Sequence, residues 1–218
     1  KKISSSKGEF NKVIEINSAF NFKITRASQN TSWEDFSFNK HNNIKNFKYE
    51  NSNKIIFKSK RLTKHKINSK ILFEDDNHIL NDEQGNIIVY SIYKKKIIDN
   101  FNFYKKKYKK IDKKLNLIVE KGIIYVCDNI GYVYAYNYKS KKILWAKNLK
   151  IPFRSNIKLS STNLIAANQN NDLYILEKKI GNLLKLIPSE ETSINNQFSN
   201  SLVLGEGEIF FLNTYGSL

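Results

Sequence analysis

The chain contains 218 residues, of which 40% are hydrophobic and 13% aromatic, and it carries a formal net charge of +17. This composition supplies ample apolar side chains for a folded core. No run of about 18 apolar residues occurs, which excludes a membrane-spanning helix. The single cysteine excludes a disulfide framework within the chain.

The positive charge could indicate a nucleic-acid partner. The lysines, however, are spread over nearly every expected turn, as at residues 94–96, and accompany abundant Asn and Ile. That profile is typical of an AT-rich genome. We therefore expect a solvated basic surface and no nucleic-acid partner, with attraction to anionic lipid headgroups as a weaker alternative.

The first 70 residues show little regular pattern. Residues 13–16 (VIEI) alternate between apolar and polar side chains and predict an isolated strand with no hairpin partner nearby. Residues 17–50 are polar and aperiodic, and the cluster NTSW at 30–33 is their one distinctive feature. Residues 54–58 (KIIFK) resemble the outer strand of a sheet.

From residue 71 onward, one unit recurs along the chain. Each copy joins short apolar runs through polar turns, and the matching turn positions are Gly85, Gly131, Asn171 and Gly216, which lie 46, 40 and 45 residues apart. The runs are too short and too rich in Ile, Val and Tyr for helices, so they predict strands. Gly, and less readily Asn, adopts the positive φ that a tight hairpin turn requires.

A period of roughly 40–50 residues with about four short strands predicts a β-propeller. We expect an all-β fold, a partial β-propeller of four-stranded antiparallel blades, with residues 1–218 as a single domain. Blades are expected over residues 71–112, 113–153 and 154–198, and a further blade begins at 199–218. Residues 1–70 supply an irregular first part and the strand at 13–16, which would close the ring.

The chain is also expected to be a piece of a longer protein. It lacks Met and stops inside an expected strand. A closed ring of six to eight blades needs roughly 250–350 residues at this period. The sequence would therefore cover about half of an eight-bladed ring.

Residues 135–145 (AYNYKSKKILW) resemble the AxDxxTGxxxW signature of pyrroloquinoline-quinone-like propellers. Ala135 and Trp145 occupy the two ends of the signature. The tryptophan is expected to lie over a small residue, such as Ala135, or against a neighbouring blade, and to fill the gap between blades. The third copy has Gly181 in the glycine slot, and the first copy has Asp99 in the tryptophan slot.

The order of three segments resembles the BamB family, in its alphaproteobacterial form. They are GEFNKVIEIN at residues 8–17, NTSW at 30–33 and IPFR at 151–154. These proteins are propeller lipoproteins of the outer-membrane β-barrel assembly machinery. The resemblance implies a non-catalytic scaffold at the periplasmic face of the outer membrane, anchored by an N-terminal lipid outside these residues. It also implies binding to BamA-type POTRA domains, and to nascent outer-membrane proteins as a further partner.

The family contact falls on Ile151, Phe153 and Arg154, in the loop between two blades. The acidic pair that the family places before the next blade falls near Asn196 and Phe198, where this chain has no carboxylate. The residues alone also favour this loop, because Pro152 stiffens a crossing over the rim and an arginine beside an aromatic ring is common in interfaces. Phe153 and Arg154 are expected to be exposed there. A structural arginine that binds neighbouring carbonyl groups is the alternative.

No catalytic residue, metal site or cofactor is expected. His41, His65 and His78 have no spacing that gathers metal ligands, and the acidic pairs are adjacent in sequence, so their side chains diverge on a strand. A quinoprotein dehydrogenase needs a calcium cage and usually adjacent cysteines. A pyrroloquinoline-quinone-dependent dehydrogenase-like enzyme and a generic protein-binding propeller are the two alternatives to the BamB-like scaffold.

Overall fold

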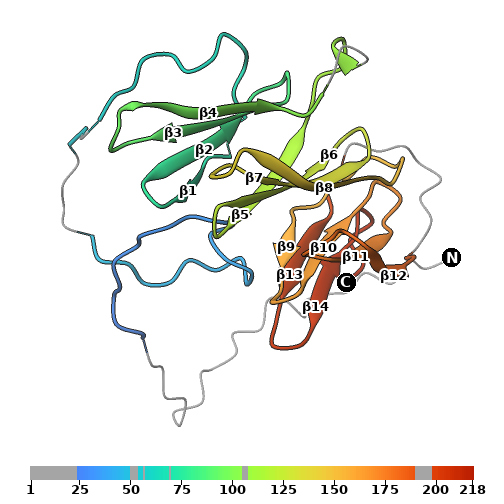
Figure 1. Cartoon of the computed structure of the whole chain (residues 1–218). Helices are drawn as coiled ribbons and strands as arrows, with labels where there is room; N and C mark the ends of the chain where they lie inside the picture. The colour runs from blue at the N-terminus through green and yellow to red at the C-terminus, as the bar shows by residue number, and fades with distance from the viewer. Residues whose placement is uncertain (1–23, 50–53, 56, 69, 105–107, 190–197) are drawn as a thin grey trace, which may run out of the picture.

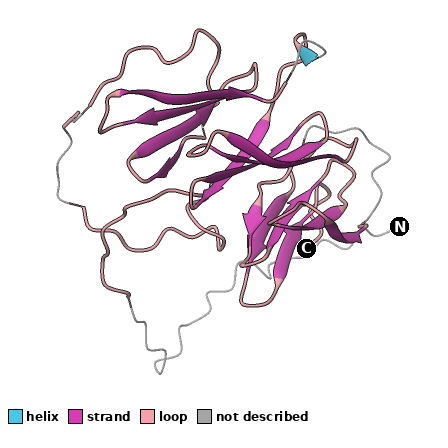
Figure 2. Ribbon diagram, viewed as in Figure 1, coloured by secondary structure: helices cyan, strands magenta, loops and turns pink. Residues whose placement is uncertain are grey.

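The computed structural model describes residues 24–49, 54–55, 57–68, 70–104, 108–189 and 198–218. These residues form fourteen strands (Figures 1 and 2). The strands, in chain order, are β1 (Leu72–Glu74), β2 (Asn77–Asn81), β3 (Asn86–Ser91), β4 (Lys96–Asn102), β5 (Leu115–Glu120), β6 (Ile123–Asp128), β7 (Tyr132–Asn137), β8 (Lys142–Asn148), β9 (Lys158–Leu159), β10 (Asn163–Ala167), β11 (Leu173–Glu177), β12 (Leu183–Ile187), β13 (Ser201–Leu204) and β14 (Ile209–Leu212).

Three successive sheets each contain four strands paired in chain order. These are β1–β4, β5–β8 and β9–β12, and β13 with β14 forms a two-stranded fourth sheet. Every pair is antiparallel. The predicted all-β fold, a partial β-propeller of four-stranded antiparallel blades, is confirmed. The sheets lie within residues 71–112, 113–153, 154–198 and 199–218.

The core lies between consecutive sheets. The second strand of the middle sheet, β6, is buried on both faces because its residues alternate between two clusters. Ile124 and Val126 face the first sheet, whereas Tyr125 and Cys127 face the third. A third cluster joins Ile165 and its neighbours in the third sheet to the fourth sheet. Blades stacked face to face in this way explain why the central strands read as unbroken apolar runs.

The turn that follows the second strand of each sheet is built on one side chain. The Asp128 carboxylate accepts hydrogen bonds from the backbone N–H groups of residues 130, 131 and 132 at 2.7–2.8 Å. Asp82, Asn168 and Asn213 accept equivalent bonds in the other three turns. These four residues recur at the same intervals as the turn glycines. The sequence repeat is therefore also a repeat of turn-capping side chains.

The turn positions inferred from the repeat all have positive φ. The angles are 79° at Gly85, 100° at Gly131, 64° at Asn171 and 89° at Gly216. At Gly131 the requirement is also steric, since an added Cβ would lie 2.8 Å from the backbone nitrogen of Ile151. A side chain there would collide with the connection to the next sheet.

The segment around Trp33 pairs with the first sheet, which its sequence did not predict. Trp33 and Phe73 exchange both backbone hydrogen bonds, at 2.8 and 2.9 Å, so residue 33 adds to the free edge of β1. The strand expected at 54–58 is wrong for residues 54, 55, 57 and 58, which adopt no strand. No backbone hydrogen bond joins these four residues to another described segment. The strand predicted at 13–16 lies outside the described residues.

Residues 33–42 then cross the innermost strands of all four sheets in order. After the pairing of Trp33 with β1, Val119 of β5 donates its N–H to Glu34, at 2.9 Å. Lys158 of β9 forms an ion pair with Asp35 at 2.6 Å, and Leu204 of β13 donates its N–H to the carbonyl oxygen of Lys40 at 2.8 Å. We call residues 33–42 the axial segment; Figure 1 shows it in blue beside β1 and β5.

Candidate functional site

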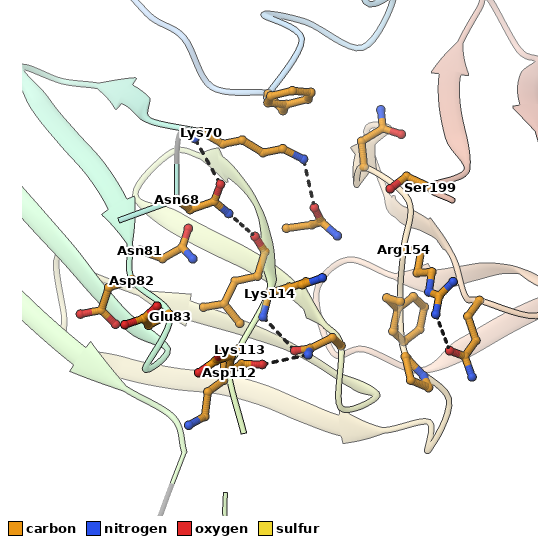
Figure 3. Close-up of a pocket in the computed structure, with 18 of the residues that line it drawn as sticks. Asn68, Lys70, Asn81, Asp82, Glu83, Asp112, Lys113, Lys114, Arg154 and Ser199 are labelled. Atoms are coloured by element: carbon orange, nitrogen blue, oxygen red, sulfur yellow. Dashed lines mark hydrogen bonds between the residues drawn. The ribbon is translucent and has the colours of Figure 1, made fainter. Parts of the chain in front are cut away.

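A cavity of about 860 Å³ opens on one end of the partial ring. Its walls come from the turns between second and third strands and from the connections that lead into each innermost strand (Figure 3). Phe36 and Ser37 of the axial segment contribute to the lining. Binding residues commonly lie on loops that a rigid scaffold holds in place. This cavity, which we call the axial cup, is therefore the candidate site.

The predicted contact loop at 151–154 forms part of the cup, but the expected exposure of Phe153 is wrong. Phe153 is only 2% exposed. Its ring packs edge-on against Tyr174 with centroids 5.5 Å apart, and its N–H donates to the carbonyl oxygen of Asp128 at 2.9 Å. The core between the second and third sheets captures the ring because burying a phenylalanine gains about 1.5–3 kcal/mol.

The other two residues of the predicted contact, Ile151 and Arg154, remain partly accessible. An Arg154 guanidinium nitrogen lies 3.2 Å from the side-chain oxygen of Gln169, and the Gln169 N–H donates to the carbonyl oxygen of Pro152 at 2.8 Å. These bonds tie the loop to the turn of the third sheet. The buried Phe153 thus acts as an anchor that fixes Ile151 and Arg154 beside the cup.

Lys70 is a partly buried cation of the cup that faces no carboxylate among the described residues. Its Nζ lies 3.4 Å from the side-chain oxygen of Asn116 and 3.9 Å from the centroid of the Phe36 ring. No ion pair among the described residues includes it. Burial lowers the pKa of its ammonium group. An ammonium in such surroundings is electrostatically under-compensated.

The acidic side chains of the cup offer little compensation. Both Asp82 oxygens are occupied by the turn and by Asn86 and Thr63, at 2.8–3.1 Å. Glu83 accepts a long hydrogen bond, 3.4 Å, from the N–H of Lys66. Overall, the lining holds five cationic and three acidic side chains, namely Lys66, Lys70, Lys113, Lys114 and Arg154 against Asp82, Glu83 and Asp112.

A buried amide also lines the cup. Asn81 is 1% exposed, and its side-chain oxygen has no hydrogen-bond partner among the described residues. Figure 3 shows Asn81 with Asn68 and Lys70 on one side of the cup and Arg154 with Ser199 on the other. A buried oxygen without a donor costs about 1–3 kcal/mol, so such positions merit a functional explanation.

The remaining predicted positions make contacts that stabilise the fold. Asn171 holds a small amide network: its side-chain oxygen accepts from Asn200 at 2.9 Å and from the Thr214 N–H at 3.1 Å. Ala135 lies opposite Trp145 across β7 and β8. Trp145 is 8% exposed and its Nε1 donates to the carbonyl oxygen of Lys178 in the third sheet, at 3.0 Å.

No group of three or more His, Cys, Asp or Glu in the described part of the chain could hold a metal ion. Burial lowers the pKa of His78, whose ring packs at 5.3 Å from Phe73. Across the described ranges, no helix is long and apolar enough to cross a membrane. The cationic cup, rather than an acid–base pair, is thus the chemically distinctive feature.

No protein-family model matches the sequence, and no curated protein matches it. Several solved structures are similar in fold. The computationally designed protein Ika4 is 11% identical with a TM-score of 0.57, over 71% of this chain and 89% of its own. The designed protein Ika8 is 11% identical with a TM-score of 0.56, over 67% of this chain and 43% of its own.

BamB from Moraxella catarrhalis is 12% identical with a TM-score of 0.51, over 67% of this chain and 40% of its own. The chain thus spans less than half the length of Ika8 and of this BamB. Likeness at such low identity concerns the fold alone. It agrees with the β-propeller that the strand order defines.

Proposed function

We propose that this chain is part of a non-catalytic propeller scaffold that binds another protein through the rim around the axial cup. The observation that carries the proposal is the loop at 151–154. Its aromatic residue is buried as an anchor, and its isoleucine and arginine are left partly accessible beside a cavity. A loop held in this way loses little conformational entropy when a partner binds.

The partner that we propose is a BamA-type POTRA domain at the periplasmic face of the outer membrane. Two observations support this: the BamB-like order of segments in the sequence and the shared propeller fold. Ile151 and Arg154 would make the contact, and Phe153 would position them. Nascent outer-membrane proteins are a further proposed partner of the same rim.

The test is a calorimetric titration of the full-length protein with the cognate purified periplasmic domains. Arg154→Glu should weaken binding by at least about 2 kcal/mol, or roughly thirtyfold, as expected for a central interface arginine. Lys142→Glu is the matched control, since Lys142 is exposed on the outer strand β8. The proposal is wrong if Arg154→Glu binds as tightly as the unaltered protein, or if both charge reversals weaken binding equally.

A further inference from the structure

Cationic side chains outnumber acidic ones in the lining of the axial cup. Lys70 faces an amide oxygen and an aromatic ring, with no carboxylate in ion-pair distance among the described residues. Asp82, one of the acids of the lining, is already bound on both oxygens. An added anion would meet an under-compensated cation without first displacing a salt bridge.

The uncharged part of the lining is suited to a peptide backbone. The side-chain oxygen of Asn81 is buried in the wall and accepts no hydrogen bond from the described residues, so a small shift of this wall on binding would let it receive an N–H group. The cup opens at 860 Å³, within the range of about 300–1,000 Å³ that ligand sites span. A segment with backbone N–H groups and carboxylate side chains would satisfy both the amide and the cations.

We infer that the axial cup binds an acidic, extended peptide segment of a partner protein, with Lys70 pairing a carboxylate inside the cup and Asn81 accepting a backbone N–H. Lys114 adds an exposed positive charge to the same wall. Arg154 links this cup to the rim contact, so the inference rests on the proposed function and specifies the chemistry of the partner. The axial segment supplies Phe36, whose ring centroid lies 3.9 Å from the Lys70 Nζ.

The experiment uses a fluorescent peptide that alternates Glu and Gly, titrated with the full-length protein and followed by anisotropy. A peptide with Gln in place of Glu is the ligand control. The test variant is Lys70→Met, which removes the charge and keeps an apolar stem over Phe36. Its matched control is Lys142→Met on β8, and circular dichroism checks the fold of each variant.

We expect the Glu peptide to bind and the Gln peptide not to bind. Lys70→Met should weaken the affinity for the Glu peptide about tenfold, the value of one charge-assisted hydrogen bond, and added salt should weaken it further. Lys142→Met should bind normally. Lys114→Met, which changes an exposed side chain of the cup, should weaken binding of the Glu peptide severalfold. This variant tests the inference if Lys70→Met does not fold.

Three results would overturn the inference. They are equal binding of the two peptides, equal effects of the cup variants and Lys142→Met, and displacement of the peptide by a single-stranded oligonucleotide, which would make the cup a nucleic-acid site. The inference alone fails if the periplasmic domains bind but the Glu peptide does not. The proposed function alone fails if the peptide binds in a Lys70-dependent way but the periplasmic domains do not.

Discussion

The indole ring of Trp145 lies directly on Gly181 of the next sheet. A Cβ built on Gly181 would fall well within van der Waals distance of three carbon atoms of that ring. The indole N–H also donates to the carbonyl oxygen of Lys178, at the start of the same turn. The tryptophan slot of one blade therefore meets the glycine slot of the following blade.

Gly181→Ala should destabilise the protein by about 2–5 kcal/mol. The backbone at Gly181 has a φ of 71°, which costs a residue with a side chain about 1–2 kcal/mol, and overpacking against the indole adds about 1–3 kcal/mol. Gly207→Ala is the matched control: its φ is 84°, but nothing lies within 4 Å of an added Cβ. Urea unfolding measures both, and equal losses would show that the indole contact contributes nothing.

At the interface between the first and second sheets, other residues occupy both the tryptophan slot and the glycine slot. Asp99 occupies the tryptophan slot of the first sheet, and Lys141 the glycine slot of the second; their charged atoms lie 3.9 Å apart. The Tyr136 hydroxyl also donates to Asp99 at 2.6 Å. Lys141 keeps the positive φ of the glycine that it replaces, 56°. A polar contact thus joins these two sheets where an indole joins the next two.

Lys158→Met should cost about 3–5 kcal/mol of unfolding free energy. Lys158 and Asp35 are 0% and 4% exposed, so removing the lysine leaves a buried carboxylate without its partner. Lys139→Met is the matched control, because its ion pair with Asp75 has the same length but is more than half exposed. Such a surface pair contributes about 0–1 kcal/mol. Thermal and urea unfolding of the two variants would give the comparison, and similar losses would contradict it.

Asp35→Asn should make stability rise more steeply with pH. Burial lowers the pKa of Lys158 below 10.5, and the Asp35 carboxylate partly offsets that effect. Between the lowered pKa and 10.5 the unfolded chain binds more protons than the folded protein, so the unfolding free energy increases with pH. Without the Asp35 carboxylate the pKa of Lys158 in the folded protein falls further. The pH range over which the unfolding free energy rises therefore extends to lower pH. Urea unfolding at several pH values tests this, and Lys158→Met, which lacks the group, should show no such increment.

Cys127 should resist thiol reagents in the folded protein. Its side chain is fully buried, and burial together with the charge of Asp128 raises the pKa of the thiol. Only the thiolate attacks such reagents, so labelling at about pH 8 should be slow until urea unfolds the chain. The chain has one cysteine, so the signal has a single source. Rapid labelling under native conditions would mean that the second and third sheets separate readily.

The blades could be predicted from sequence because their determinants are local. Gly85 and Gly131 recur at fixed distance from short apolar runs, and hairpin pairing follows from that spacing. The turn-capping residues Asp82 and Asp128 are separated by the same number of residues as Gly85 and Gly131. The prediction rested on the glycines and did not use these aspartates.

What could not be predicted depends on contacts between distant parts of the chain. Phe153 stands in a polar loop beside a proline, and only the position of Tyr174 makes it a core residue. Asp35 and Lys158 are 123 residues apart, and neither belongs to a motif. The cup arises where four connections meet, so its cations come from segments that are far apart in the sequence.

The axial segment sets an order on the folding of this chain. Within each sheet the strands pair with their neighbours in sequence, so a sheet can form as soon as its residues leave the ribosome. Asn42, by contrast, donates to the carbonyl oxygen of Leu202, 160 residues away. The axial segment is made before all four sheets, yet it completes its contacts only after the fourth sheet has been synthesised. Until then, the inner edge of the fourth sheet stays open, and we expect closure over such a long separation to be slow.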